Sequence, residues 1–195
     1  MKINIKKKGL IRITSGSLKN KIIHVSKSNG IRPTSEKVRQ AIFNCLTHSF
    51  PEYNFNIQNA KVADLYAGTG ALGLEALSRG ASHISFFEND ETHLETIKKN
   101  IKLLNLSSNV KIYPNDPLSV ISTLKPFDLI LVDPPYGKGL IQRSINAIAN
   151  FNLIKKSGII VIESNIDESL IPPNGMQLLK SKKYGKTLIR FTANI

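Results

Sequence analysis

The sequence lacks several features that would place it in other protein classes. Of its 195 residues, one is cysteine and none is tryptophan. The single cysteine, Cys45, excludes an internal disulfide bond and a metal site built from several cysteines. Its position in an apolar helical pattern predicts a small core residue. The four histidines, at positions 24, 48, 83 and 93, do not have the spacing of metal ligands, so no metal site is expected.

Long hydrophobic runs are also missing. The chain has no stretch of about 18 apolar residues, which excludes an ordinary membrane-spanning helix. The basic start, residues 1–9, is not followed by the apolar segment of a secretory signal. We therefore expect a soluble, cytoplasmic protein with no segment inside a membrane.

Acidic residues are few, because 14 Asp and Glu stand against 27 Lys and Arg, a net charge of +13. Residues 1–60 hold 11 basic and 2 acidic residues, residues 61–178 hold 11 and 12, and residues 179–195 hold 5 and none. Basic ends around a neutral middle predict that the ends bind a polyanion, either nucleic acid or an anionic membrane surface. A genomic bias toward lysine is the competing explanation, but it should raise lysine in the middle as well.

The first 60 residues predict a small unit of their own. Two short strands are expected at residues 10–14 and 21–25, and a capped amphipathic helix within residues 32–46. Thr34 or Ser35 can cap this helix. The polar residues 50–60 predict a linker. We therefore expect a basic N-terminal extension over residues 1–60 and a separate domain over residues 61–195.

From residue 61 onward, strands and helices alternate. Strands are expected at residues 61–66, 83–87, 110–113, 127–132 and 158–163, and helices at 71–78, 91–104, 118–124 and 140–150. Residues 177–183 and 187–192 predict a closing antiparallel hairpin. Near-continuous apolar strands between helices are typical of α/β proteins with a buried parallel sheet. In such a Rossmann-like fold the ligand binds at the carboxyl ends of the strands.

A glycine-rich turn follows the first of these strands. The sequence DLYAGTGALG, from Asp64 to Gly73, contains the GxGxxG pattern at Gly68, Gly70 and Gly73. Glycines there let the backbone approach a ligand at the start of a helix. Glu88 lies 20 residues after Gly68, where a carboxylate can accept hydrogen bonds from both ribose hydroxyls. The pattern predicts a nucleoside site, but it does not distinguish a dinucleotide from S-adenosylmethionine.

The sequence Asp133-Pro134-Pro135-Tyr136 follows the fourth strand. An exocyclic amine of a nucleobase is a poor nucleophile, because its lone pair is delocalised into the ring. Attack on a methyl sulfonium needs two acceptors that hold both amine hydrogens, and the Asp133 carboxylate and the Pro134 carbonyl can be those acceptors. The two prolines stiffen the turn. Tyr136 offers a face on which a flipped base can stack.

Together these motifs resemble class I S-adenosylmethionine-dependent methyltransferases that modify exocyclic amines. Within that class, the sequence is similar to the RsmD family over about residues 12 to 191. The similarity is carried by RPT at 32–34, KVR at 37–39, AIFN at 41–44, DLYAGTGALGLEALSRG at 64–80 and YGKT at 184–187. The resemblance implies a 16S rRNA (guanine(966)-N(2))-methyltransferase. It also implies a mostly parallel, seven-stranded sheet with a C-terminal antiparallel hairpin and a small N-terminal extension.

The resemblance further implies a role for each site residue. The cofactor-binding residues would be Asp64, Tyr66, Ala67, Gly68, Gly70, Glu88, Asn115 and Asp116. Among these, Glu88 would hold the ribose, and Asn115 and Asp116 would lie at the adenine edge. The catalytic residues would be Asp133, Pro134, Pro135 and Tyr136. The residues facing RNA would be Arg32, Lys37 and Arg39. Pro117 is a departure, because the family often has a small residue after this aspartate.

Other functions use parts of the same pattern. An N6-adenine methyltransferase of DNA or RNA would use the same DPPY motif, and a non-catalytic nucleotide-binding protein would use the glycine-rich turn alone. A plain RNA-binding module would leave the acids at the strand ends unexplained, because they would repel phosphate. We therefore expect an S-adenosylmethionine-dependent rRNA methyltransferase. Its expected partner is 16S rRNA or the assembling 30S subunit, on which it acts as a monomer.

Overall fold

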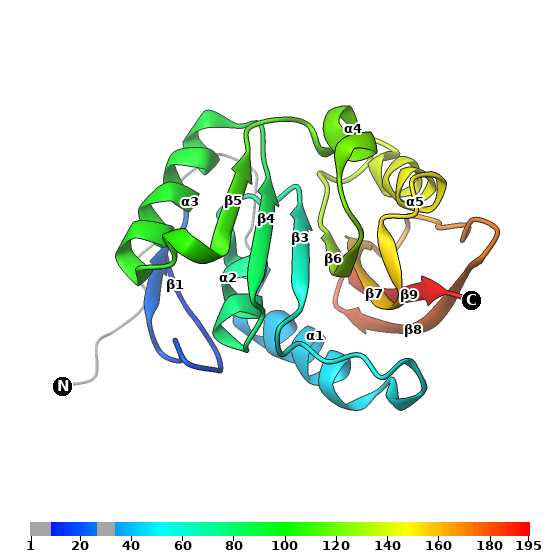
Figure 1. The fold of residues 1–195 in the computed structure, drawn as a ribbon, viewed down its shortest axis with the longest axis horizontal. Coiled ribbons are helices and arrows are strands. Elements are labelled where there is room, and N and C mark those ends of the chain that lie inside the picture. The colour runs from blue at the N-terminus through cyan, green and yellow to red at the C-terminus, as the bar shows by residue number, and fades with distance from the viewer. Residues whose placement is uncertain (1–8, 27–33) are drawn as a thin grey trace.

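The structure is a computed structural model that describes residues 9–26 and 34–195 (Figure 1). Its main sheet contains Lys61–Leu65 (β3), His83–Phe87 (β4), Val110–Tyr113 (β5), Phe127–Val132 (β6), Ile154–Asn165 (β7), Met176–Tyr184 (β8) and Thr187–Asn194 (β9). A second sheet pairs Leu10–Arg12 (β1) with Ile22–His24 (β2). The α-helices are Glu36–His48 (α1), Ala71–Ser78 (α2), Glu91–Leu104 (α3), Pro117–Val120 (α4) and Leu140–Asn150 (α5). Short 3-10 helices lie at Pro51–Tyr53 (η1), Ser107–Asn109 (η2) and Ile121–Thr123 (η3).

The main sheet has the strand order β5-β4-β3-β6-β7-β9-β8. The strands from β3 to β7 run parallel, whereas β9 is antiparallel to both β7 and β8. This arrangement confirms the predicted Rossmann-like fold with a mostly parallel, seven-stranded sheet and a C-terminal antiparallel hairpin. β7 is longer than predicted at both ends, because Ile154 pairs with Phe127 of β6 and the pairing with β9 continues to Asn165, opposite Thr187.

Helices cover both faces of the main sheet, as the near-continuous apolar strands predict. On one face, residues of α1, α2 and α3 pack with Val62, Leu129 and Leu131. On the other face, residues of α5 and η3 pack with Ile130 and Val132. Successive residues of a strand point to opposite faces, so each buried strand contributes to both cores.

The N-terminal hairpin lies against the helices of the first face (Figure 1). Its anchor is Glu75 of α2, which is fully buried. The Glu75 carboxylate accepts hydrogen bonds from the backbone N–H and the hydroxyl of Thr14, at 2.9 and 2.6 Å, and from Arg79 at 2.8 Å. Gly16 comes so close to α2 that a Cβ there would lie 1.7 Å from the carbonyl oxygen of Ser78. The position therefore requires glycine.

Helix α1 begins as its sequence predicts, with Ser35 as the N-cap whose side chain accepts from the Val38 N–H. Cys45 is buried in the core, as predicted. The segment expected as a polar linker, residues 50–60, begins instead with the buried Phe50. Its ring centroid lies 5.3 Å from that of Phe191 in β9. In the part of the chain that the structure describes, no helix has the length and apolar character needed to cross a bilayer.

Candidate functional site

A cavity of about 690 Å³ lies at the carboxyl ends of the parallel strands. This volume is typical of small-molecule sites. Ten predicted site residues line it: Asp64, Tyr66, Ala67, Gly68, Glu88, Asp116, Asp133, Pro134, Pro135 and Tyr136. Two other predicted residues, Gly70 and Asn115, do not line it. Gly70 forms the N-cap of α2 with a φ of 77°, and Asn115 is exposed. The fold thus brings the glycine-rich turn and the DPPY sequence to one space.

Glu88, directly after β4, is held by a set of N–H donors. One carboxylate oxygen accepts from the Gly68 N–H at 2.7 Å, and the other accepts from the N–H groups of Asn89 and Asp90, both at 2.9 Å. His93 Nδ1 lies 3.5 Å from the first oxygen. Burial acts to raise the pKa of Glu88, but the hydrogen bonds from His93, Asp90 and Gly68 outweigh it and lower the pKa. Glu88 is therefore a fixed anion at the cavity wall.

Asp64 lies at the floor of the cavity, near the end of β3, and only 1% of it is exposed. Its Oδ2 accepts from the Gly73 N–H of α2 at 2.9 Å. Burial raises the pKa of Asp64 to about 8, against the opposing effect of the Gly73 hydrogen bond, and the charge of Glu88 adds to the rise. A Cβ on Gly73 would lie 2.4 Å from Phe86 and 3.0 Å from Asp64 Oδ2, so only glycine fits there.

Asp133 follows β6, and its carboxyl faces a second carboxyl, that of Glu163 in β7. The two share one hydroxyl, because Thr34 Oγ1 lies 2.9 Å from Glu163 Oε2 and 3.3 Å from Asp133 Oδ2. Burial raises the pKa of Asp133 well above its usual range, and the charges of Glu163 and Asp64 raise it further. Burial likewise raises the pKa of Glu163. These carboxyls can accept donors from a ligand or stabilise a positive charge.

Tyr66, after β3, and Tyr136, in the DPPY sequence, are far apart in the chain but line the same cavity. Tyr136 is 48% exposed, so its ring is accessible for stacking. Its hydroxyl hydrogen-bonds with Thr187 at the start of β9. Tyr66 has a φ of 63°, rare outside glycine, and its hydroxyl lies 2.9 Å from that of Ser144. That bond fixes the Tyr66 ring against α5.

Asp116 lines the cavity and also caps a helix. It is the N-cap of α4, and its Oδ1 accepts from the Leu118 N–H at 2.8 Å. Pro117, the departure from the family pattern, occupies the first turn of α4, where the missing N–H has no helical partner in any case. The proline is therefore compatible with a cavity-lining Asp116.

The three residues predicted to face RNA differ in where the structure places them. Arg32 lies outside the described residues. Lys37 is exposed on α1. The prediction for Arg39 is wrong, because its side chain is only 1% exposed and its guanidinium donates to the carbonyls of Thr34 and Arg12, both at 2.7 Å. Arg39 anchors the start of α1 and has no free surface for phosphate.

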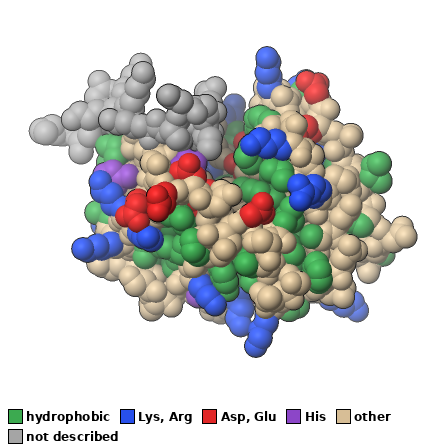
Figure 2. All heavy atoms as spheres, turned by 90° about the horizontal axis from the view of Figure 1, so that it is seen from above, with side chains coloured by type: hydrophobic (Ala, Val, Ile, Leu, Met, Phe, Trp, Pro, Cys, Tyr) green, Lys and Arg blue, Asp and Glu red, His purple; other side chains and the backbone are tan. Residues whose placement is uncertain are grey.

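Figure 2 looks onto the end of the molecule at which β5 leads into α4. Lysine and arginine side chains are spread over this face and do not form one patch. Acidic side chains also reach it. Among the described residues, basic and acidic side chains are therefore mixed on this face.

Sequence reasoning missed several polar residues that line the cavity, and three of them bear on the predicted site residues. Thr34 was considered only as a helix cap, although its hydroxyl bridges Asp133 and Glu163. Glu163 closed the predicted strand at 158–163, so the rule that ligands bind at strand ends could have identified it. His93 lies in α3 three residues after the N-cap Asp90, and no sequence signal connects it to Glu88.

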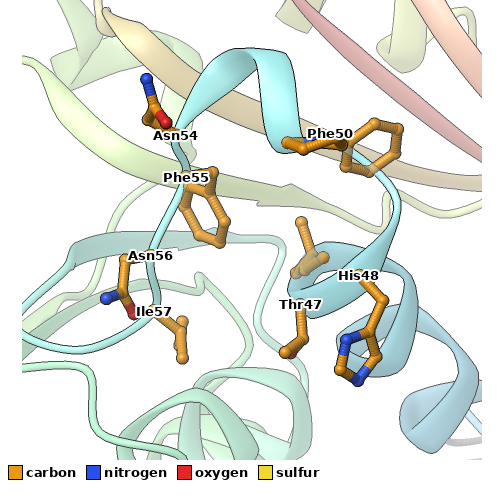
Figure 3. Close-up of a pocket in the computed structure, with 9 residues that line it drawn as sticks. Thr47, His48, Phe50, Asn54, Phe55, Asn56 and Ile57 are labelled. Atoms are coloured by element: carbon orange, nitrogen blue, oxygen red, sulfur yellow. The ribbon is translucent and has the colours of Figure 1, made fainter.

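A second cavity, of about 500 Å³, lies between the end of α1 and residues 54–57 (Figure 3). The Phe55 ring reaches into this space, whereas the amides of Asn54 and Asn56 turn away from it. No Asp, Glu, Lys or Arg lines it, so it offers few groups for chemistry. Over residues 9–26 and 34–195, no group of three or more His, Cys, Asp or Glu is arranged to hold a metal ion.

Comparisons with known proteins find relatives along nearly the whole chain. The family model described as Conserved hypothetical protein 95 matches residues 11–193. The Ribosomal RNA small subunit methyltransferase D of Buchnera aphidicola subsp. Acyrthosiphon pisum is 37% identical over 179 residues, which cover 91% of this chain and 90% of that protein. The protein of the same name from Escherichia coli (strain K12) is 31% identical, and the match covers 93% of this chain and 89% of that protein.

A solved structure is similar over nearly its whole length. The "Putative methyltransferase yhhF from Escherichia coli" has a TM-score of 0.82 and 29% identity, and the match covers 95% of this chain and 98% of that one. The sequence resemblance, the family model and these relatives all agree. The chain therefore belongs to the RsmD family of class I, S-adenosylmethionine-dependent methyltransferases.

Proposed function

We propose that this chain transfers a methyl group from S-adenosylmethionine to the exocyclic N2 of a guanine in 16S rRNA. The observation that carries the proposal is that Glu88 and the DPPY residues line one cavity. A cofactor bound at Glu88 would therefore lie beside a base bound at Asp133. The names of the relatives support rRNA as the substrate. The family resemblance implies guanine 966 as the target.

The residues of the cavity fit this cofactor. The Glu88 carboxylate is fixed at the cavity wall by backbone N–H groups, and ribose hydroxyls would donate to its oxygens by sharing them with those donors. Around the Cβ position of Gly68 nothing lies within 4 Å, so a ligand can approach its backbone closely. When bound, S-adenosylmethionine supplies an electrophilic methyl group on a positively charged sulfur. The carboxyls of Asp64 and Asp133 are suited to stabilise that charge.

The DPPY residues position the base. The Asp133 carboxylate and the Pro134 carbonyl accept the two hydrogens of the amine and turn its lone pair toward the methyl group. Tyr136 stacks on the flipped base, for which its half-exposed ring is accessible. The amine becomes acidic once it is methylated, so it needs no base before attack and can then release a proton to Asp133. Positioning and fixed charges provide most of the rate enhancement.

The basic ends hold the RNA in this proposal. Residues 1–60 form an rRNA-binding extension, with Lys37 exposed on α1, and residues 61–195 form the catalytic domain. At the C-terminal hairpin, Lys183 and Lys186 are exposed beside the turn. Thr187, directly after that turn, hydrogen-bonds with Tyr136. A phosphate bound at the turn would therefore lie near the base-stacking ring. The enzyme would act as a monomer in the cytoplasm, on 16S rRNA or on the assembling 30S subunit.

The first experiment incubates the protein with labelled S-adenosylmethionine and unmethylated 16S rRNA, naked and in 30S subunits, and identifies the product nucleoside by mass spectrometry. We expect N2-methylguanosine. N6-methyladenosine would instead favour the amino-methyltransferase alternative that uses the same DPPY motif. Cofactor binding without transfer to any RNA would contradict the proposal and favour a non-catalytic nucleotide-binding protein.

A second experiment replaces the proposed amine acceptor. Asp133→Ala should lower methyl transfer at least about a hundredfold, because it removes a fixed acceptor from the transition state. Calorimetric binding of S-adenosylmethionine should remain measurable, since Glu88 is unchanged. The exposed Asp167→Asn serves as a control for the loss of one carboxylate. Turnover of Asp133→Ala near the wild-type value would refute the catalytic assignment.

A further inference from the structure

Three carboxyls lie in a row at the carboxyl end of the sheet. Asp64, Asp133 and Glu163 belong to or directly follow the neighbouring strands β3, β6 and β7. In the sheet register, Asp64 pairs with Leu131, and Val132 pairs with Ile162. The residues that follow Val132 and Ile162 are Asp133 and Glu163, which are therefore adjacent. Asp64 lies level with Leu131, two residues before Asp133. Because side chains alternate along a strand, all three carboxyls point to the same face. We call these three residues the carboxyl row.

Glu163 has no role in the function proposed above, although it lines the cavity and only 7% of it is exposed. Its hydrogen bond comes from Thr34, whose single hydroxyl hydrogen also has Asp133 within reach. Across the described ranges, 9–26 and 34–195, no Lys, Arg or His forms an ion pair with the carboxyl row. A buried carboxylate without a cation or a full set of donors is costly. A ligand that donates hydrogen bonds would offset that cost.

We propose that Glu163 recognises the target base as guanine by accepting a hydrogen bond from its N1–H, next to the N2 amine held by Asp133. The inference rests on the function proposed above and adds the residue that selects the base. Guanine presents N1–H and the N2 amine as neighbouring donors on its Watson–Crick edge. Neighbouring strands lie about 4.8 Å apart, so acceptors after β6 and within β7 can meet two adjacent donors of one base.

This arrangement excludes adenine. Adenine carries an exocyclic amine beside N1, but its N1 has a lone pair and no hydrogen. With the adenine amine at Asp133, that lone pair would face the Glu163 carboxylate, and both would remain without a donor in a buried site. The DPPY motif alone serves amines of several bases. Glu163 therefore supplies the base specificity that the motif lacks.

The experiment uses the 16S rRNA substrate identified by nucleoside mass spectrometry, rebuilt with guanine or 2-aminopurine at the target position. 2-Aminopurine keeps the amine at C2 but has no hydrogen on N1. For the wild-type protein we expect kcat/KM for guanine to exceed that for 2-aminopurine at least about a hundredfold, because a site built around a donor rejects the analogue without it. Because 2-aminopurine also lacks the oxygen at C6, a variant at Glu163 completes this comparison.

The variant Glu163→Gln then tests the residue itself. The glutamine amide can accept from N1–H of guanine or donate to the bare N1 of 2-aminopurine, so we expect the preference to fall to about tenfold or less. A purely structural role would lower transfer to both bases alike and leave their ratio unchanged. Glu95→Gln is the matched control, because Glu95 is 70% exposed on α3, and it should keep the wild-type ratio.

The outcomes separate this inference from the function on which it rests. If the wild-type protein does not methylate guanine N2, the proposed function fails. If it does, but Glu163→Gln keeps the wild-type ratio, the inference about Glu163 is overturned and the function stands. A wild-type preference for 2-aminopurine would also overturn it. Burial raises the pKa of Glu163, and that preference would mean a protonated carboxyl donates to the base.

Discussion

Asp64 should make the stability of the protein depend on pH in an unusual direction. Its folded-state pKa is about 8, against 3.8 for an ordinary aspartate, chiefly because the carboxyl is buried. The folded protein therefore keeps a proton that the unfolded chain releases above about pH 4. Where the folded state binds more protons than the unfolded state, the free energy of unfolding decreases as the pH rises. The loss contributed by Asp64 begins near pH 4 and is complete above pH 8.

The magnitude follows from the size of the shift. One pKa unit corresponds to about 1.4 kcal/mol, so a shift of about 4 units costs at most about 6 kcal/mol at high pH. Between pH 6 and pH 8, where the folded carboxyl still holds most of its proton, the loss grows by about 2 kcal/mol. That change is large against the total stability of an ordinary domain.

The substitution Asp64→Asn removes this titration and changes little else. Asparagine has nearly the same shape, and its carbonyl oxygen can still accept from the Gly73 N–H. We expect the free energy of unfolding of the variant, minus that of the wild type, to rise by about 2 kcal/mol from pH 6 to pH 8. Asp133 and Glu163 remain in both proteins, so most of their own titration cancels in this difference.

The assay is urea unfolding of both proteins without cofactor, at matched ionic strength, in half-unit steps of pH. Asp167→Asn, at an exposed position, measures the effect of removing a carboxylate from the surface. A difference between Asp64→Asn and wild type that stays flat or falls from pH 6 to pH 8 would refute the reasoning, because the folded carboxyl would then be ionised throughout.

Three further predictions concern Gly73 behind Asp64, Glu88 in the cavity wall and the turn of the C-terminal hairpin. Gly73→Ala should lower the free energy of unfolding by about 1–3 kcal/mol in urea titrations, because its Cβ would lie 2.4 Å from the fully buried Phe86. Glu88→Gln should weaken S-adenosylmethionine binding about tenfold or more by calorimetry, since an amide N–H would meet backbone N–H donors where a carboxylate oxygen now accepts them; unchanged affinity would exclude Glu88 from the cofactor site. Replacing Lys183 and Lys186 together by glutamine should reduce the slope of log affinity for rRNA against log salt by about 2 if both contact phosphate, and an unchanged slope would place the RNA elsewhere.

Much of this site could be predicted because its residues follow a local rule. Glu88 and Asp133 stand at the ends of apolar strands, and parallel strands bring their carboxyl ends to one edge. The glycine pattern likewise fixes a turn within a few residues, where local sequence and local structure coincide. The limits of β7 could not be predicted from its own residues, because they depend on its pairing with β6 at the start and with β9 at the end.

The errors concern contacts between residues far apart in the sequence. Thr34 lies one residue before the N-cap Ser35, and the local pattern indicates only a cap, whereas its hydroxyl contacts Asp133 and Glu163. Arg39 carries a charge in a basic segment, which favours an exposed position. It is buried because the carbonyls of Arg12 and Thr34 accept its donors. No periodicity of one helix reveals such partners, because they come from other elements.

The sign of the charge within the cavity separates the candidate cofactors. A dinucleotide carries a negatively charged pyrophosphate, whereas S-adenosylmethionine carries a positively charged sulfur. Two unit charges 4 Å apart interact by about 4 kcal/mol at the effective dielectric near a protein surface, so even one ionised member of the carboxyl row strongly favours the cation. Binding of that cation should in turn stabilise the ionised carboxyls and release protons, which would leave Asp133 and Glu163 as acceptors when the base arrives. The exposed lysines of the C-terminal turn, Lys183 and Lys186, do not oppose this, because charges more than about 10 Å away are largely screened at ordinary salt. One chain can thus attract the phosphates of RNA at its surface and a cationic cofactor at the floor of its cavity.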